Sequence, residues 1–134
     1  MKTLLVLPLA AFAAIALTGP SAAGGRMTDE EKLAKAIEGR VAEAPVKCVN
    51  MRDLGGNKSA GETAIIFNGR TNKLIYVNRP AAGCPDLSFG RALQVRTTTT
   101  RLCRGDIVTV FDPLNGSQYG GCGLGEFTPY RRAR

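Results

Sequence analysis

The sequence predicts a mainly β domain: a small antiparallel barrel or sandwich with one N-terminal helix, stapled by two disulfides. Three observations lead to this fold class. From residue 46 onward, runs of β-branched and aromatic residues alternate with turn-forming residues, and no helical pattern lies between them. One capped amphipathic segment precedes these runs. Four widely spaced cysteines occur in a chain that begins like an exported protein. The absence of helices between strands excludes parallel β-α-β units.

Residues 1–23 have the layout of a secretory signal peptide. A basic residue is followed by an apolar run over 4–17, a Gly-Pro helix breaker and the small residues 21–23. Because the apolar run is shorter than the ~20 residues of a membrane span, we expect cleavage near Ala23 rather than a retained anchor. The mature protein is then periplasmic or secreted and has no transmembrane segment. The remaining residues suit one small domain.

Residues 24–45 predict a helix and a linker. Thr28 is a helix N-cap, and Glu31 completes a capping box with it. The apolar face is narrow and recurs every four residues, at Leu33, Ile37 and Val41. Such a face indicates a helix that leans on the domain rather than forming its core. Pro45 is expected to stop the helix.

Residues 46–130 form the predicted β domain. The expected strands are 46–51, 62–68, 73–78, 92–100, 106–112 and 124–130. The sequence "GRTN" between the second and third of them indicates a hairpin. Turn-forming residues predict loops over 53–61, 79–90 and 113–123. Pro129 restricts the last strand to a sheet edge, and residues 131–134 form a short basic tail.

The stretch "YGGCGLGEF" invites comparison with a phosphate-binding loop. Gly121 and Gly123 fit the first two glycines of a dinucleotide fingerprint, but Glu126 replaces the third, and no helix follows. We therefore interpret the glycines as letting the backbone turn tightly around Cys122, so that a crosslink pulls a long loop onto the domain.

The charge balance favours anionic partners. The chain has 18 Lys and Arg against 11 Asp and Glu, a net charge of +7. Such a balance attracts acidic surfaces weakly and also serves solubility alone. Candidate anion contacts are the arginines of the C-terminal tail, Arg131, Arg132 and Arg134. We expect an anionic envelope component as the partner rather than nucleic acid.

Several kinds of chemistry are excluded by composition. The chain has no histidine, which rules out Ser-His-Asp and Cys-His catalysis and any zinc set that contains histidine. The cysteines lack the Cys-x-x-Cys spacing of redox pairs and zinc knuckles, so we expect no metal or cofactor. An even number in an exported chain predicts two disulfides among Cys48, Cys84, Cys103 and Cys122. The spacing allows all three pairings.

The alternative function is that of a small hydrolase using a pair of carboxylates. Its candidates are Asp53, Asp86, Asp106, Asp112 and Glu126. Each has a simpler structural role; for example, Asp112 starts a turn before Pro113, and Asp106 follows a glycine at a strand entry. We therefore predict a non-enzymatic protein without catalytic residues.

Aromatic and threonine residues also have structural interpretations. Phe67, Tyr76, Phe111 and Phe127 alternate with polar residues along strands, which favours core packing over a ligand-stacking platform. Thr97–Thr100 could resemble a hydroxyl-lined binding face, but there is a single copy. A β-branched, half-solvated strand explains this run better.

The segments "LAKAIEGRV", "PVKCVNMRDL", "LIYVNRP", "RLCRGDIVTVFD" and "LGEFTPY" together resemble a family of small exported alphaproteobacterial proteins of unknown function. The resemblance covers roughly residues 30–130. Many members carry only the cysteines that match Cys48 and Cys103, whereas this chain adds Cys84 and Cys122. By analogy, the resemblance implies the pairings Cys48–Cys103 and Cys84–Cys122. It implies no activity, cofactor or site.

Overall fold

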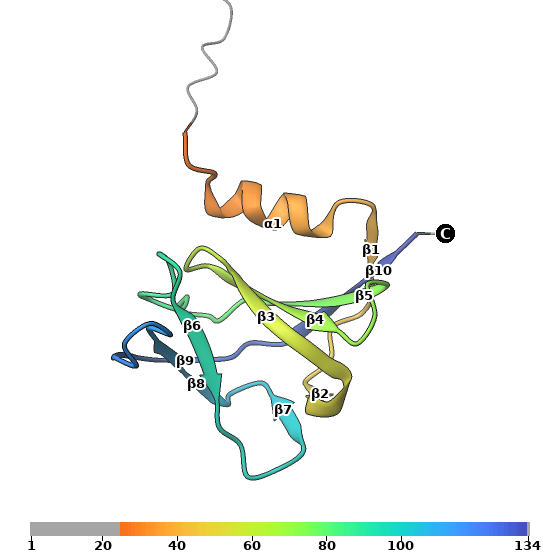
Figure 1. The fold of residues 1–134 in the computed structure, drawn as a ribbon. Helices are drawn as coiled ribbons and strands as arrows, with labels where there is room; N and C mark the ends of the chain where they lie inside the picture. The colour runs from red at the N-terminus through yellow and green to blue at the C-terminus, as the bar shows by residue number, and fades with distance from the viewer. Residues whose placement is uncertain (1–24, 134) are drawn as a thin grey trace, which may run out of the picture.

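The computed structural model describes residues 25–133, so the predicted signal peptide 1–23 lies outside the described residues. The described chain contains one α-helix, one 3-10 turn and ten strands (Figure 1). Their bounds are α1 (Asp29–Ile37), β1 (Arg40–Ala42), β2 (Cys48–Asn50), η1 (Met51–Asp53), β3 (Leu54–Ala60), β4 (Ala64–Gly69), β5 (Leu74–Asn78), β6 (Ala92–Val95), β7 (Arg101–Cys103), β8 (Ile107–Phe111), β9 (Gln118–Gly123) and β10 (Phe127–Arg132).

Three antiparallel sheets build the domain. The central sheet has the strand order β1-β10-β5-β4-β3, and the two smaller sheets are β2-β7 and β6-β8-β9. Helix α1 covers one face of the central sheet, and the smaller sheets lie on the other side (Figure 1). An open hollow of about 330 Å³ is lined by residues of β3 and β6 and by apolar residues of the main core. The predicted mainly β fold is thus confirmed in a sandwich-like form, without a closed barrel.

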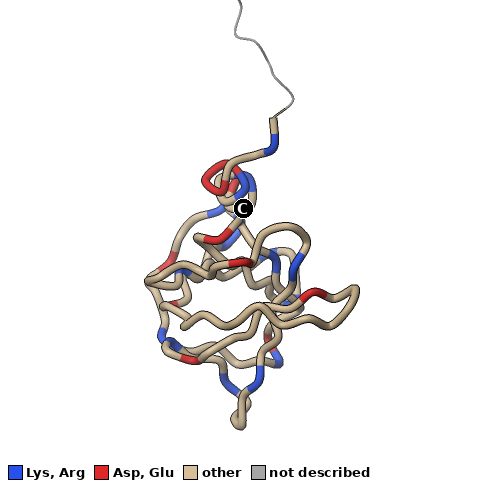
Figure 2. The backbone as a smooth tube through the Cα atoms, turned by 90° about the vertical axis from the view of Figure 1, so that its left-hand side faces the viewer, with Lys and Arg blue, Asp and Glu red and all other residues tan. Residues whose placement is uncertain are grey.

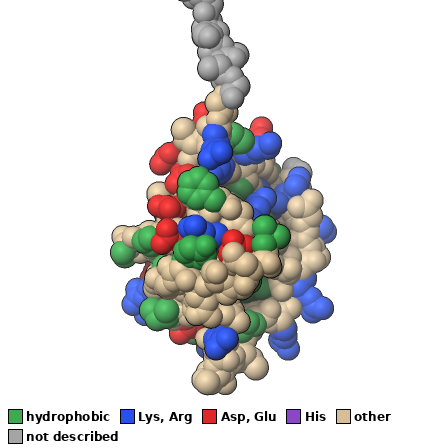
Figure 3. Space-filling view, turned by 60° about the vertical axis from the view of Figure 1, so that its left-hand side comes forward, with side chains coloured by type: hydrophobic (Ala, Val, Ile, Leu, Met, Phe, Trp, Pro, Cys, Tyr) green, Lys and Arg blue, Asp and Glu red, His purple; other side chains and the backbone are tan. Residues whose placement is uncertain are grey.

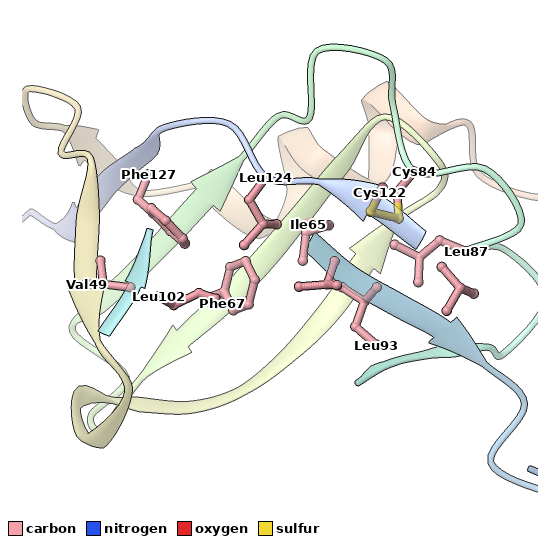
Figure 4. Packing of buried hydrophobic residues seen from close by; sticks show 12 residues of the cluster. Val49, Ile65, Phe67, Cys84, Leu87, Leu93, Leu102, Cys122, Leu124 and Phe127 are labelled. Carbon is pink, nitrogen blue, oxygen red and sulfur yellow. A yellow bond between two sulfur atoms is a disulfide. The ribbon is translucent and has the colours of Figure 1, made fainter. Parts of the chain in front are cut away.

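The central sheet carries an apolar cluster on each face, because successive side chains of a strand point to opposite sides. The main core lies between the sheets (Figure 4) and includes Ile65, Phe67 and Phe127. Phe67 and Tyr76 pack against Phe127 at centroid distances of 5.5 and 6.5 Å, which confirms core packing for these three rings. Phe111 is only half-buried. The second cluster lies between α1 and the central sheet, and we call it the helix cluster. It consists of Leu33 of α1 and the sheet residues Ala60, Ala64, Ile66, Ile75 and Val77.

Two disulfides join distant parts of the chain. Cys48 lies directly opposite Cys103 in the β2-β7 pair, and the bond between them joins these strands. Cys84, in the irregular segment before β6, is bonded to Cys122 of β9 inside the main core (Figure 4). Both pairings implied by the family resemblance are confirmed.

Two segments that the sequence predicted to be loops contain strands. Residues 53–61 include β3, which pairs with β4 and has a bulge at Gly55, and residues 113–123 include β9, which pairs with β8. Ladder hydrogen bonds to an apolar neighbour hold such a glycine-rich strand, although its own side chains contribute little. At Gly121 a Cβ would come within 2.8 Å of the Val108 carbonyl oxygen, so the glycine allows β9 to approach β8 closely. The prediction of a tight turn around Cys122 was therefore wrong.

The helix is shorter than predicted. It ends at Ile37 rather than near Pro45, because Gly39 has a φ of +70° and turns the chain into β1. Val41, expected on the apolar helix face, instead lies in β1 opposite Arg131 and is 60% exposed.

The last strand begins and ends later in the chain than predicted and does not lie at an edge. Strand β10 runs through Arg132 and lies between β1 and β5, so the expected edge position for Pro129 was wrong. The Pro129 carbonyl accepts from the Glu43 N–H, just beyond the last β1–β10 register pair. The N and C=O of an antiparallel residue point to the same side. Pro129 therefore lacks its N–H on the side that faces Glu43, beyond the last residue of β1, so no hydrogen bond of the β1–β10 ladder is lost.

The threonine run is a loop rather than a strand. Strand β6 ends at Val95, and the loop that follows lies at the end of the molecule opposite α1 (Figure 1). The Thr97 and Thr99 hydroxyls both donate to the Arg101 carbonyl, at 3.4 and 2.9 Å. Local hydrogen bonding by threonine side chains competes with strand pairing, which explains why this part of the predicted strand 92–100 does not form.

Candidate functional site

A groove of about 470 Å³ lies between α1 and the central sheet. Its floor includes the buried side chains of Ile66 and Ile75, together with the amides of Asn68 and Asn72. None of the described residues that line it is acidic, and five are basic: Lys32, Lys35, Arg40, Lys58 and Arg132. On the face that Figure 3 shows, acidic side chains lie mainly along one flank and most Lys and Arg side chains along the other.

The helix is fixed over the sheet at both ends. At its N-terminus the predicted capping box forms, and the Asp29 carboxylate accepts from the Glu62 N–H at 3.1 Å. Asp29 also lies directly against Gly61, where a Cβ would overlap the carboxylate. Beyond the C-terminus of the helix, the Ala133 N–H donates to the Gly39 carbonyl at 3.2 Å, which ties residue 133 to the turn between α1 and β1; Figure 2 looks roughly along α1 and shows the helix above the rest of the domain. These contacts fix the position of α1 over the sheet and therefore fix the shape of the groove.

Two arginines face each other across neighbouring strands in this groove. Arg40 of β1 and Arg132 of β10 are direct register partners, so their side chains emerge on the same face of the sheet. Both guanidinium groups donate to the backbone carbonyl of Asn72, each at 3.0 Å. Both also donate to Asn72 Oδ1, at 3.4 and 3.3 Å. We call Arg40 and Arg132 the arginine pair.

The arginine pair has no carboxylate partner among residues 25–133, where the five ion pairs involve other residues. The Nη1 group of Arg40 is buried and makes no hydrogen bond. Burial lowers the pKa of Arg40, and the neighbouring Arg132 guanidinium lowers it further. Both effects disfavour positive charge at this position. An anion placed against the arginine pair would offset the repulsion between the two guanidinium groups.

Three lysines complete the basic lining. Lys32 and Lys35 extend from α1, and Lys58 extends from β3, the strand at the far edge of the central sheet from β1. We call these three the lysine set. Lys32 forms an ion pair with Asp29 at 3.8 Å, whereas Lys35 and Lys58 form none within the described chain.

The predicted anion contacts are divided by the sheet. Arg132 belongs to the groove, whereas Arg131 points to the opposite face and forms an ion pair with Glu43 at 2.5 Å. The hydrogen bond to Glu43 raises the pKa of Arg131. Arg134 lies outside the described residues. The residues that sequence reasoning missed are Arg40 and the lysine set, since only strand register and helix placement bring them beside Arg132.

The carboxylates weighed for hydrolysis mostly have local partners. Within the described chain these are Arg52 for Asp53, Arg91 for Asp86, the Cys103 N–H for Asp106, the Leu114 N–H for Asp112 and Arg104 for Glu126. Asp53 and Glu43 line a separate hollow of about 290 Å³, where Glu43 is bound to Arg131. No group of three or more Cys, Asp or Glu side chains that could hold a metal occurs among the described residues.

Comparison of the chain with protein-family models, with curated proteins and with solved structures finds no match. The groove is therefore interpreted from its own geometry and charge.

Proposed function

We propose that this protein is a non-enzymatic exported domain that binds an anionic component of the cell envelope in the groove under α1. The observation that carries the proposal is the arginine pair, in which Arg40 and Arg132 lie directly opposite each other and share Asn72 without a carboxylate. Like charges that face each other across strands are destabilising. Such a pair is expected where an anionic ligand supplies the missing charge.

The chemistry of guanidinium groups favours an oxyanion. Arginine presents a planar fork of donors that matches phosphate and carboxylate oxygens, and these charge-assisted hydrogen bonds are about twice as strong as neutral ones. The buried Nη1 of Arg40 has a donor to spare. A buried donor without a partner costs about 1–3 kcal/mol, which an anion recovers when the Arg40 side chain shifts to bring Nη1 to the groove.

Export is supported by the cysteines and by the leader. The described cysteines are all in disulfides, and such bonds persist in oxidising compartments such as the periplasm and the exterior. Residues 1–23 have the composition of a cleavable signal peptide. No helix in the described part of the chain is long and apolar enough to cross a membrane. The mass of the protein recovered from the periplasm of an exporting host tests this part, because cleavage after Ala23 leaves a chain that begins at Gly24.

The binding proposal is tested by titrating the protein recovered from the periplasm with inorganic phosphate at low salt. The binding is measured by NMR from changes in the backbone amide chemical shifts. We expect the largest shifts in α1, β1, β10 and the turn at Asn72. Arg40→Gln and Arg132→Gln should each weaken binding about tenfold, as expected for the loss of one charge-assisted hydrogen bond.

Arg131→Gln is the matched control. It removes the same charge from the adjacent residue of the same strand, but on the face where Glu43 already neutralises it. We expect this variant to bind phosphate nearly as well as the wild type. Equal weakening by all three substitutions would show general attraction to a basic protein and would contradict a site in the groove.

A further inference from the structure

The basic side chains of the groove fall into two separate groups. The arginine pair lies on β1 and β10, at one edge of the central sheet. In the lysine set, Lys58 is on β3, and Lys32 and Lys35 are on α1, whose contacts with the sheet are mainly with β3 and β4. Strands β5 and β4 separate β10 from β3. At roughly 4.8 Å per strand, the backbones of β10 and β3 are about 14 Å apart.

The floor between the two groups is neutral. Ile66 of β4 and Ile75 of β5 are buried there, and Asn68 is the register partner of Ile75. A single small oxyanion held by the arginine pair would leave the lysine set unneutralised. Only Lys32 of that set has a carboxylate partner within the described chain, Asp29.

We infer that the groove takes an extended ligand with at least two phosphate groups, one at the arginine pair and one at the lysine set. This inference rests on the proposed anion-binding function and names its ligand class. Phosphate suits the arginine pair because its several oxygens can accept from two guanidinium forks at once. Lysine ammonium groups bind phosphate as point charges and therefore suit a second, less strictly oriented group. The neutral floor accommodates the linking part of the ligand.

Two sources supply this chemistry. One is a linear inorganic oligophosphate, and the other is a membrane lipid whose headgroup carries two phosphates. Both place anionic groups at separate points along one molecule, so the groove alone selects for the shared feature. The experiment has an arm for each source.

The first arm measures calorimetric affinities for orthophosphate, pyrophosphate, tripolyphosphate and longer polyphosphate, using the protein recovered from the periplasm. We expect the affinity per polyphosphate molecule to rise with the length of the polyphosphate until the ligand spans both groups of basic side chains. Beyond that length the affinity should level off. In the double variant Lys35→Gln/Lys58→Gln, tripolyphosphate should bind at least about tenfold more weakly, while orthophosphate affinity changes less than about twofold. The matched control is Lys47→Gln, which removes an exposed lysine outside the groove and should leave both affinities unchanged.

The second arm uses phosphatidylcholine vesicles with and without phosphatidylinositol bisphosphate. Binding that requires the bisphosphate, is displaced by tripolyphosphate and is lost in the double variant would identify a lipid headgroup as the source. Oligophosphate binding without vesicle binding would identify the free chain.

Three results would overturn the inference. One is an affinity that does not depend on chain length, and another is a double variant that weakens orthophosphate and tripolyphosphate equally. In either case orthophosphate still binds, so the proposed function survives while its ligand class changes. Failure of the wild-type protein to bind any of these phosphates would remove the proposed function as well.

Discussion

The two faces of the central sheet differ in what fills them. On one face the main core has twelve buried residues, including both sulfurs of the Cys84–Cys122 disulfide. On the other face the helix cluster has six buried residues, and the groove with its basic side chains lies beside it. The same strands serve both faces: in β4, Ile65 and Phe67 point into the main core, whereas Ile66 points toward the helix.

We infer that the face with the main core chiefly stabilises the fold, whereas the face with the groove is available for ligand binding. Burial of apolar surface is the main stabilising term in folding, and here most of it lies on the face opposite the groove. The arginine pair is tolerated on the other face because Phe127 anchors β10 in the main core and β10 pairs with β5 along its length. The same division is seen within the six residues of β10, since Phe127 is fully buried in the main core and Arg131 and Arg132 point to opposite faces.

The largest expected effect is the loss of the disulfide in the main core. Replacing both Cys84 and Cys122 by alanine should lower the free energy of unfolding by about 5 kcal/mol. About 4 kcal/mol comes from loop entropy over the 38-residue separation, and the remainder from lost packing at two buried positions. Urea denaturation at neutral pH measures the change.

The Cys48–Cys103 disulfide is the matched control. Its separation of 55 residues gives a similar loop-entropy contribution of about 4 kcal/mol, but both cysteines are only half-buried. Replacing this pair by alanine should therefore cost less than replacing the buried pair. If the half-buried pair costs more, packing in the main core does not explain the difference between the disulfides.

The next largest decreases in the free energy of unfolding are expected from truncating one buried side chain on each face. Phe127→Ala empties the centre of the main core and should cost about 4 kcal/mol, whereas Leu33→Ala, at the only buried residue of α1, should cost about 2 kcal/mol. The second loss should be local. Hydrogen exchange should show faster opening of α1 with β4 and β8 still protected. Equal loss of protection throughout the domain in the Leu33 variant would contradict two separable faces.

Most of the fold could be predicted from residues that carry their own local signal. Strands β4, β5 and β8 are rich in β-branched and aromatic residues, and the capping box marked the start of α1. Strands β3 and β9 could not be predicted, because their glycine-rich sequences have no apolar alternation and acquire strand structure only from their neighbours. The expectation that turn formers mean loops fails where a strong strand offers an edge.

The candidate site was much harder to predict than the fold. Basic composition indicated an anionic partner, and Arg132 was singled out because it lies in an arginine-rich C-terminus. Its partner Arg40 lies near the start of the domain, and only the β1–β10 register brings the two together. Nothing in the local sequence distinguishes Arg131, which is neutralised by Glu43, from Arg132, which is not. A one-residue change of register would exchange their faces.

The smallest predicted effect is a change in the free energy of unfolding, and its direction tests whether the two arginines of the arginine pair repel each other. Without ligand, Arg40→Gln should raise the free energy of unfolding by about 0.5 kcal/mol, since it removes a like-charge contact across β1 and β10. Arg131→Gln should instead lower it slightly, because it breaks the ion pair with Glu43. Urea denaturation at low and high salt separates the two, because salt should reduce both differences toward zero. If Arg40→Gln destabilises the protein, its hydrogen bonds to Asn72 outweigh the repulsion, and the unliganded arginine pair supports the fold rather than straining it.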